Sequence, residues 1–141
     1  MRDLHHNIKR VRSISPVAIG TTGTGKTGVI VDRLGFQSVT FEFDYGTITA
    51  TNATITPTVL HGDVTGTMTS IADADLISTE AVAGIPAAAT RTSGTNKNVS
   101  KTLGYKGVKR YVQAKLVSTV TAGPPVAATV LLGSAANRPA Q

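Results

Sequence analysis

Apolar and polar residues alternate along residues 37–45, and this pattern limits the structures that the chain can adopt. One set of alternating positions is mainly apolar and the other is polar or charged: Val39, Phe41, Phe43 and Tyr45 against Ser38, Thr40, Glu42 and Asp44. A period of two residues is typical of a strand with one buried face. Threonine, which is β-branched and favours strands, occurs 22 times and often stands near Ile, Val or Ala. The sequence therefore predicts an all-β protein.

Other segments have the same strand-and-turn character. Residues 110–120 alternate, with inward positions at Val112, Ala114, Leu116 and Val120. Shorter strands are expected within residues 47–61, 64–71, 99–105 and 126–132, between turn signals at 61–63, 106–107 and 123–125. Pro57 indicates an edge or a bend in its strand. Residues 72–80 suit one or two helical turns or an ordered loop, and residues 81–98 suit a long loop.

This succession predicts a single antiparallel β-sandwich or jelly-roll-like domain over residues 20–133. Residues 1–19 are expected to form an extended N-terminal arm. Their apolar positions have a mixed spacing, and Pro16 excludes a helix through the middle. Residues 134–141 are expected to form a polar C-terminal tail.

Residues 20–27 match the phosphate-binding pattern G-x-x-x-x-G-K-[ST]. A phosphate-binding loop of this kind joins a buried strand to a helix, whose first N–H groups face the phosphates. Here Gly28 and the β-branched run Val29–Val31 follow the motif, and these residues favour a strand. Pro16 also disfavours a central strand before the loop. We therefore expect a Thr/Gly loop that carries an exposed Lys26, and no nucleotide hydrolase.

Composition narrows the function further. Without cysteine, the 141-residue chain has no disulfide and no thiolate metal site. No secretory leader and no apolar run of about 20 residues is visible, so we expect a protein made in a cytoplasm and not associated with a membrane. The net charge of +6 comes largely from residues 2–12 and 97–115. Because these basic residues are not interleaved with a set of stacking aromatic residues, an acidic protein partner is favoured over specific nucleic-acid binding.

No set of residues has the pattern of an active site. Adjacent His5 and His6 point in opposite directions on an extended chain, and His61 stands in a turn. The acidic residues in 73–80 lack the spacing of a calcium loop, and no serine lies in a nucleophile elbow. We therefore expect no catalytic residue, no metal and no cofactor.

Several segments in order along the chain resemble a family of small structural proteins from tailed bacteriophages. They are residues 1–9, the run from Gly62 to Leu76, the run from Leu103 to Val112, and Val130–Gly133 followed by Arg138–Pro139. The family is usually met beside the major capsid protein. The resemblance implies a non-enzymatic decoration or cement protein on the capsid exterior, synthesised in the bacterial cytoplasm, with the major capsid protein as partner.

Decoration proteins bind repeated sites on a shell as symmetric oligomers, so we expect a homo-oligomer, with a trimer as the leading expectation. The arm could add a strand to a neighbour's sheet, and its basic residues would steer it towards an acidic surface. The residues expected to contact partners are Ile8, Lys9, Arg10, Arg12 and Lys26. The alternatives are a tail-tube, tail-terminator or head–tail joining protein and, less favoured, a P-loop nucleotide hydrolase or a basic nucleic-acid-binding protein.

Overall fold

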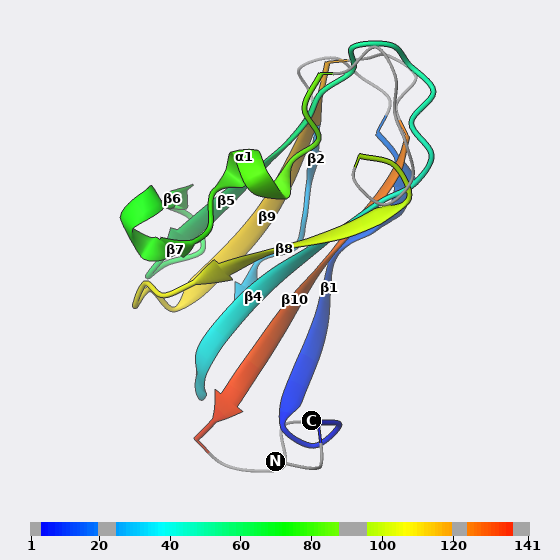
Figure 1. Cartoon of the computed structure of the whole chain (residues 1–141). Coiled ribbons are helices and arrows are strands. Elements are labelled where there is room, and N and C mark those ends of the chain that lie inside the picture. Colours follow the sequence, from blue (N-terminus) through cyan, green and yellow to red (C-terminus); the bar gives the residue numbers. More distant parts are fainter. Residues whose placement is uncertain (1–3, 20–24, 88–95, 120–123, 137–141) are drawn as a thin grey trace.

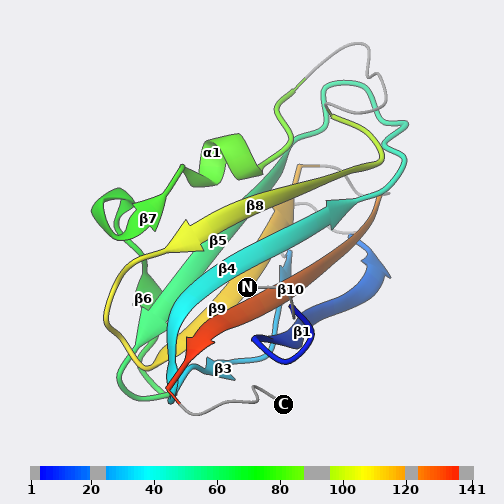
Figure 2. The ribbon, with the colours of Figure 1, turned by 60° about the horizontal axis from the view of Figure 1, so that its bottom comes forward.

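A computed structural model describes residues 4–19, 25–87, 96–119 and 124–136. Its strands pack as two antiparallel sheets (Figures 1 and 2). The strands are β1 (Ile8–Ala18), β2 (Lys26–Thr27), β3 (Val31–Asp32), β4 (Phe36–Tyr45), β5 (Ile55–Gly62), β6 (Thr69–Ser70), β7 (Leu76–Ile77), β8 (Val99–Tyr105), β9 (Tyr111–Ser118) and β10 (Pro125–Ala135). The 3₁₀ turn η1 (Asp73–Asp75) and the short helix α1 (Glu80–Ala83) complete the described elements.

The strand pairings follow a long hairpin that is wrapped on itself. β1 pairs with β10, β2 and β3 pair with β9, β4 pairs with β8, and β5 pairs with β6. Two further pairings, β10 with β4 and β9 with β5, close the wrapped hairpin into sheets of order β1-β10-β4-β8-β7 and β2-β9-β5-β6. Two sheets connected in this way are the jelly-roll arrangement. The predicted all-β, jelly-roll-like sandwich is confirmed.

The core lies between the sheets and is built from the alternation seen in the sequence. On β4, Val39, Phe41, Phe43 and Tyr45 are all buried, and the Phe41 and Phe43 rings stack with their centroids 6.4 Å apart. The opposite layer supplies Val112, Ala114 and Leu116 of β9, together with Ile55 and Val59 of β5. Burial of these side chains holds the two sheets together.

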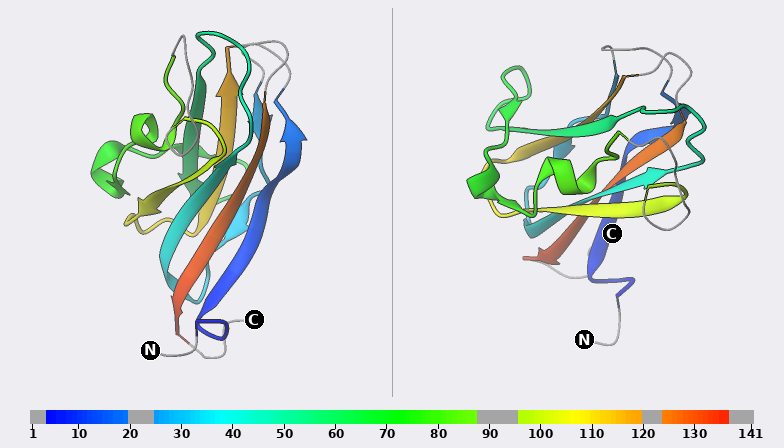
Figure 3. Two further views of the ribbon diagram at one scale, coloured as in Figure 1. Left: turned by 45° about the vertical axis from the view of Figure 1, so that its right-hand side comes forward. Right: turned by 45° about the horizontal axis from the view of Figure 1, so that its top comes forward.

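The first and last segments of the described chain belong to the sheet, which corrects two expectations. Residues 8–18 are extended, but they form β1 at the edge of the sandwich, paired with β10, and are not an arm that stands apart from it (Figure 3). β10 continues to Ala135, so the first residues of the expected tail are strand residues. Residues 1–3 and 137–141 lie outside the described residues.

The middle of the chain contains less strand than expected. Within 47–61 the strand begins only at Ile55, and His61 and Gly62 end this strand instead of forming a turn. Within 64–71 only Thr69 and Ser70 are paired. The expected loop 81–98 begins inside α1, which lies beside β5 and β8 at one margin of the sandwich (Figure 2). Residues 88–95 lie outside the described residues.

The backbone after the glycine-rich motif is extended, as predicted. Lys26 and Thr27 form β2, Val31 and Asp32 form β3, and no helix occurs within residues 25–38. The motif therefore lacks the helix N-terminus that a phosphate-binding loop requires. Residues 20–24 of the motif lie outside the described residues.

Candidate interaction surface

Four of the five predicted contact residues lie on the first half of β1, at the edge of its sheet. Register with β10 places Arg10 opposite Leu131 and Arg12 opposite Thr129. Because Leu131 and Thr129 alternate with the buried residues of β10, the Arg10 and Arg12 side chains lie on the outer face of the sheet. Ile8 shares this face, and Lys9 is opposite the inward-facing Leu132.

The second half of β1 is irregular. Register shifts occur between Arg12 and Ile14 and again between Ile14 and Val17, and Pro16 lies in the second shift. The chain between β2 and β3 also crosses here, where the Val29 amide donates to the carbonyl of Ser13 at 2.9 Å. Such irregularities limit the addition of another strand. The first half, from Ile8 to Arg12, pairs with β10 without a shift.

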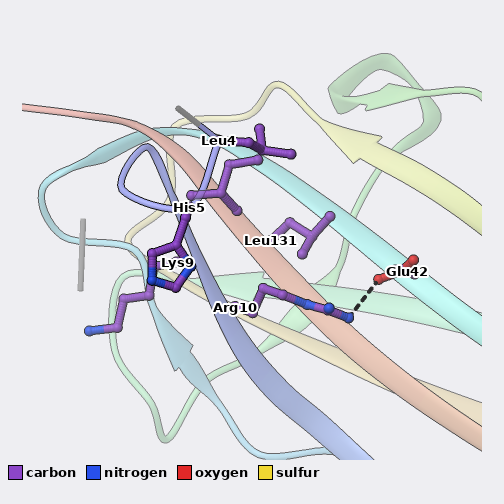
Figure 4. A pocket seen from close by; sticks show the side chains of 7 residues that line it. Leu4, His5, Lys9, Arg10, Glu42 and Leu131 are labelled. Atoms are coloured by element: carbon purple, nitrogen blue, oxygen red, sulfur yellow. Dashed lines mark hydrogen bonds and ion pairs between the residues drawn. The ribbon is translucent and has the colours of Figure 1, made fainter. Parts of the chain in front are cut away.

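A hollow opens beside the first half of β1 (Figure 4). It has a volume of about 840 Å³ and is lined by Leu4, His5, Ile8, Lys9, Arg10, Glu42 and Leu131. Arg10 reaches across β10 and donates to the carboxylate of Glu42 on β4 at 3.3 Å. The Arg10 side chain is 67 % exposed, so this ion pair contributes little to stability. Its effect is to fix the position of one basic group at the rim of an apolar hollow.

The other predicted residue lies elsewhere, and several lining residues were missed. Lys26 is exposed on β2 in the second sheet, where it is opposite Leu116 of β9, and it does not line the hollow. Sequence reasoning missed Leu4, His5, Glu42 and Leu131 as lining residues. Glu42 was visible as a polar-face residue of its strand, but its position opposite β1 depends on β10 lying between them.

Three of the basic residues in 97–115, namely Lys101, Lys109 and Arg110, have partners within the fold. Lys101 donates to the carbonyl of Gly84 at 2.6 Å at the end of α1, and burial lowers the pKa of its ammonium group. Arg110 binds Asp32 at 2.7 Å, and this hydrogen bond lowers the pKa of the Asp32 carboxyl. Lys109 binds Asp63 at 2.5 Å. Lys101, Lys109 and Arg110 are thus engaged within the fold, whereas Arg12 of β1 is exposed and forms no ion pair within the described residues.

The histidines and acidic residues that were considered as catalytic candidates make contacts with other residues of the fold. The His61 ring lies 3.0 Å from the hydroxyl of Tyr105, which accepts a hydrogen bond from the Lys109 amide. Glu80 accepts a hydrogen bond from the backbone of β5. His5 and His6 stack edge to face. Within residues 4–19, 25–87, 96–119 and 124–136, no three His, Cys, Asp or Glu side chains are grouped to hold a metal ion.

Comparison with known proteins gives the fold but no family. No protein-family model matches the sequence, and no curated protein matches it. Among solved structures, the chain is similar to the VP2 subviral particle of infectious bursal disease virus. The TM-score is 0.50 at 9% identity, over 92% of this chain and 32% of that one. The fold is jelly-roll-like, as in viral capsid proteins.

A second structure, from the Gx strain of the same virus, is also similar. It has a TM-score of 0.43 at 9% identity, over 91% of this chain and 32% of that chain. The chain thus spans about a third of the length of the viral proteins that it matches. Within the described residues, no helix is long and apolar enough to cross a membrane.

Proposed function

We propose that this chain is a non-enzymatic structural protein of a virion, and that it binds the exterior of a bacteriophage head as a decoration or cement protein. The observation that supports this proposal most is the jelly-roll fold, which is similar to a viral capsid protein over 92% of the chain. A compact sandwich of this kind offers flat faces and strand edges for contacts with a shell, and it needs no deep pocket.

The distribution of charge agrees with a protein partner on such a shell. Arg10 and Arg12 lie on the outer face at one edge of the sandwich, while the basic residues Lys101, Lys109 and Arg110 have partners within the fold. A basic edge attracts an acidic surface and increases the rate of association. The proposed partner is the major capsid protein. The proposed oligomer is a symmetric one, with a trimer as the first form to test by native mass spectrometry.

Copy number tests the proposed place in the virion. Particles of the virus that encodes this chain would be purified, and the ratio of this chain to the major capsid protein would be measured by quantitative mass spectrometry. A ratio that corresponds to hundreds of copies is expected for decoration. Six or twelve copies would instead favour a tail-tube, tail-terminator or joining protein, and absence from the particles would refute a virion role.

Binding to shells that lack the protein provides a second test. The purified chain would be mixed with shells assembled without it and sedimented. We expect saturable binding and a higher temperature of shell disruption, because a ligand that binds only the assembled shell stabilises it. Binding without any change in shell stability would support decoration but contradict a cement role.

A further inference from the structure

The margin of the second sheet along β5 is closed by local segments. Ile55 exchanges two backbone hydrogen bonds with Ile85, at 3.0 and 2.8 Å. Pro57 has no N–H group to satisfy. The amide of Val59 donates to the carboxylate of Glu80 at 2.6 Å. The N–H groups that could pair with another chain are thus occupied or absent along this margin, as is usual for sheet edges in natural proteins.

The first half of β1 differs from the β5 margin in the direction of its free backbone groups. The hydrogen bonds of β10 show which groups of β1 face away from the sheet. The carbonyl of Pro124 accepts from Ile19, on the β1 side, and the carbonyl of Pro125 accepts from Gly46, on the β4 side. β10 then pairs with β4 without a register shift from Val126 to Gly133. Backbone groups therefore alternate along β10, with even-numbered residues directed to β1 and odd-numbered residues directed to β4.

This alternation determines which groups of β1 face outward. Lys9 and Val11 lie opposite even-numbered residues of β10 and direct their backbone groups to it. Ile8, Arg10 and Arg12 lie opposite odd-numbered residues, so their N–H and C=O groups point away from the sheet. In the described part of the chain β10 is the strand that pairs with β1, and it lies on the other side. These three residues form an open edge of regular strand.

The side chains beside this open edge favour an acidic partner. Glu42 lies opposite Thr129 in the register and is therefore in line with Arg12. The carboxylate of Glu42 pairs with Arg10. The exposed Arg12 has no ion pair within the described residues. The hollow lined by Leu4, Ile8 and Leu131 lies at the other end of the open edge and can hold an apolar side chain.

We infer that Ile8–Arg12 accepts an extended segment of the shell protein as an additional strand of the sheet. The inference rests on the proposed function and names the segment that the proposed site would bind. Main-chain hydrogen bonds to Ile8, Arg10 and Arg12 would supply affinity. An acidic side chain of the segment would pair with Arg12, and an apolar side chain would enter the hollow beside Ile8.

A second copy of β1 is a less suitable occupant. An antiparallel pair of these edges would bring the two sets of arginines together, and like charges on neighbouring strands are destabilising. The arginines would deter self-pairing in the free protein, as charged residues do on other exposed edges. The same arginines would attract an acidic segment. The charge of β1 therefore favours another polypeptide over a second copy of β1.

Hydrogen exchange tests the open edge in the free protein. Residue-resolved exchange by NMR should show fast exchange of the amides of Arg10 and Arg12 and slow exchange of the amides of Lys9 and Val11, whose groups face β10. Slow exchange at Arg10 and Arg12 in the free protein would overturn the inference, because it would mean that the edge is already occupied. This result does not depend on the proposed function.

Two substitutions at one position test the added strand. Arg10→Ala and Arg10→Pro both remove the guanidinium group, but only Arg10→Pro removes the outward N–H. Both variants should unfold at similar temperatures. Val11→Pro should unfold at a much lower temperature, because it removes the Val11 N–H group that forms a hydrogen bond with β10. On shells assembled without the protein, Arg10→Pro should bind roughly five- to tenfold more weakly than Arg10→Ala, the effect of one main-chain hydrogen bond.

Charge reversal tests the chemistry of the segment. Arg12→Glu should weaken shell binding and reduce its dependence on salt, while Lys106→Glu, an exposed control in the loop after β8, should bind as the unchanged protein does. If the unchanged protein binds shells and Arg10→Pro binds as tightly as Arg10→Ala, the added strand is refuted and the proposed function stands. If the unchanged protein does not bind shells, the proposed function fails and the inference fails with it.

Discussion

The carboxylate of Glu80 accepts a hydrogen bond from the backbone amide of Val59 at 2.6 Å, so a side chain of α1 acts where a neighbouring strand would. Among the residues that the structure describes, β6 pairs with Leu60 and His61 of β5, and Ile85 pairs with Ile55. Glu80 satisfies the amide between these two contacts. It thereby fixes the segment that closes this margin of the sandwich.

Two substitutions of Glu80 should distinguish the effect of this hydrogen bond on stability from the effect of the carboxylate charge. Glu80→Ala should lower the free energy of unfolding by about 1–2 kcal/mol, because the Val59 amide loses its acceptor. Glu80→Gln keeps an acceptor at the same position and should be close to the unchanged protein. Urea denaturation of the three proteins at neutral pH measures the difference, and equal loss in both variants would contradict the proposed role of the hydrogen bond.

The pH dependence of the same carboxyl has a definite sign. Burial raises the pKa of Glu80 above its ordinary value of 4.5 and is the largest effect; the hydrogen bond from Val59 lowers the pKa, and the charge of Asp73 raises it. The folded protein therefore holds this proton more tightly than the unfolded chain does. Stability due to this group is present at low pH and is lost as the pH rises above about 4.5. The stability of the unchanged protein relative to Glu80→Gln should therefore fall as the pH is raised from below 4.5 towards neutrality, as measured by thermal unfolding at a series of pH values.

Arg33 should be important for stability although it is a charged residue. Its guanidinium group donates to the carbonyl of Gly107 at 2.6 Å and to those of Lys109, Phe36 and Gln37 at 3.3–3.4 Å. It thus joins the loop after β8 to the start of β4. Arg33→Ala should cost about 2–3 kcal/mol, since it leaves several carbonyls without a donor.

The matched control for Arg33 is Arg110, which also forms hydrogen bonds but to an exposed carboxylate. Arg110 and Asp32 are 45% and 40% exposed. Arg110→Ala should change stability only slightly, because exposed ion pairs contribute little. Denaturant titrations of the two variants would contradict this account if Arg110→Ala were the more destabilised protein.

Gly28 should not tolerate a side chain. It lies where the chain crosses between the two sheets, with its amide bonded to Ala114 at 2.8 Å, and a Cβ atom there would contact the Ser13 hydroxyl and lie 2.9 Å from the Ser13 carbonyl. Gly28→Ala should destabilise the fold by about 1–3 kcal/mol through overpacking. Gly66→Ala is the control, since nothing lies within 4 Å of its Cβ position. Similar melting temperatures for the two variants would show that β1 can move away from Gly28 at little cost.

Tyr45 should link α1 to the core. Its hydroxyl donates to the carbonyl of Ala83 at 2.7 Å inside the protein, and burial raises the pKa of the phenol above its ordinary value of 10.0. Tyr45→Phe should cost about 1–2 kcal/mol near neutral pH. Because the unfolded phenol ionises first, the stability contributed by Tyr45 should decline as the pH rises above about 10. The gap between the two proteins in denaturant titrations should therefore narrow at high pH, and a constant gap would contradict the assignment.

Much of the fold follows from local patterns, and the misses have physical causes. The alternation of β4 predicted its buried face, and β8 was predicted with the bounds that the structure has. β1 was interpreted as an arm because its two register shifts interrupt the alternation. β6 and β7 contain two residues each, too few to produce a periodic pattern.

The candidate surface was predicted only in part. The basic residues of β1 were visible as a cluster, but Glu42 and Leu131 join them through pairing between strands that are far apart in the sequence. Lys26 was grouped with them on the evidence of the motif, and the structure places it in the other sheet.

The sequence by itself determined that the chain forms strands, which of their faces are buried, and that the backbone after Lys26 is extended. These properties depend on each residue and its immediate neighbours, through side-chain branching and the period of two. Only the tertiary structure decided that β1 pairs with β10 and keeps one edge open between Ile8 and Arg12. Strand partners are chosen by long-range packing and hydrogen bonding, which the alternation within one strand does not specify.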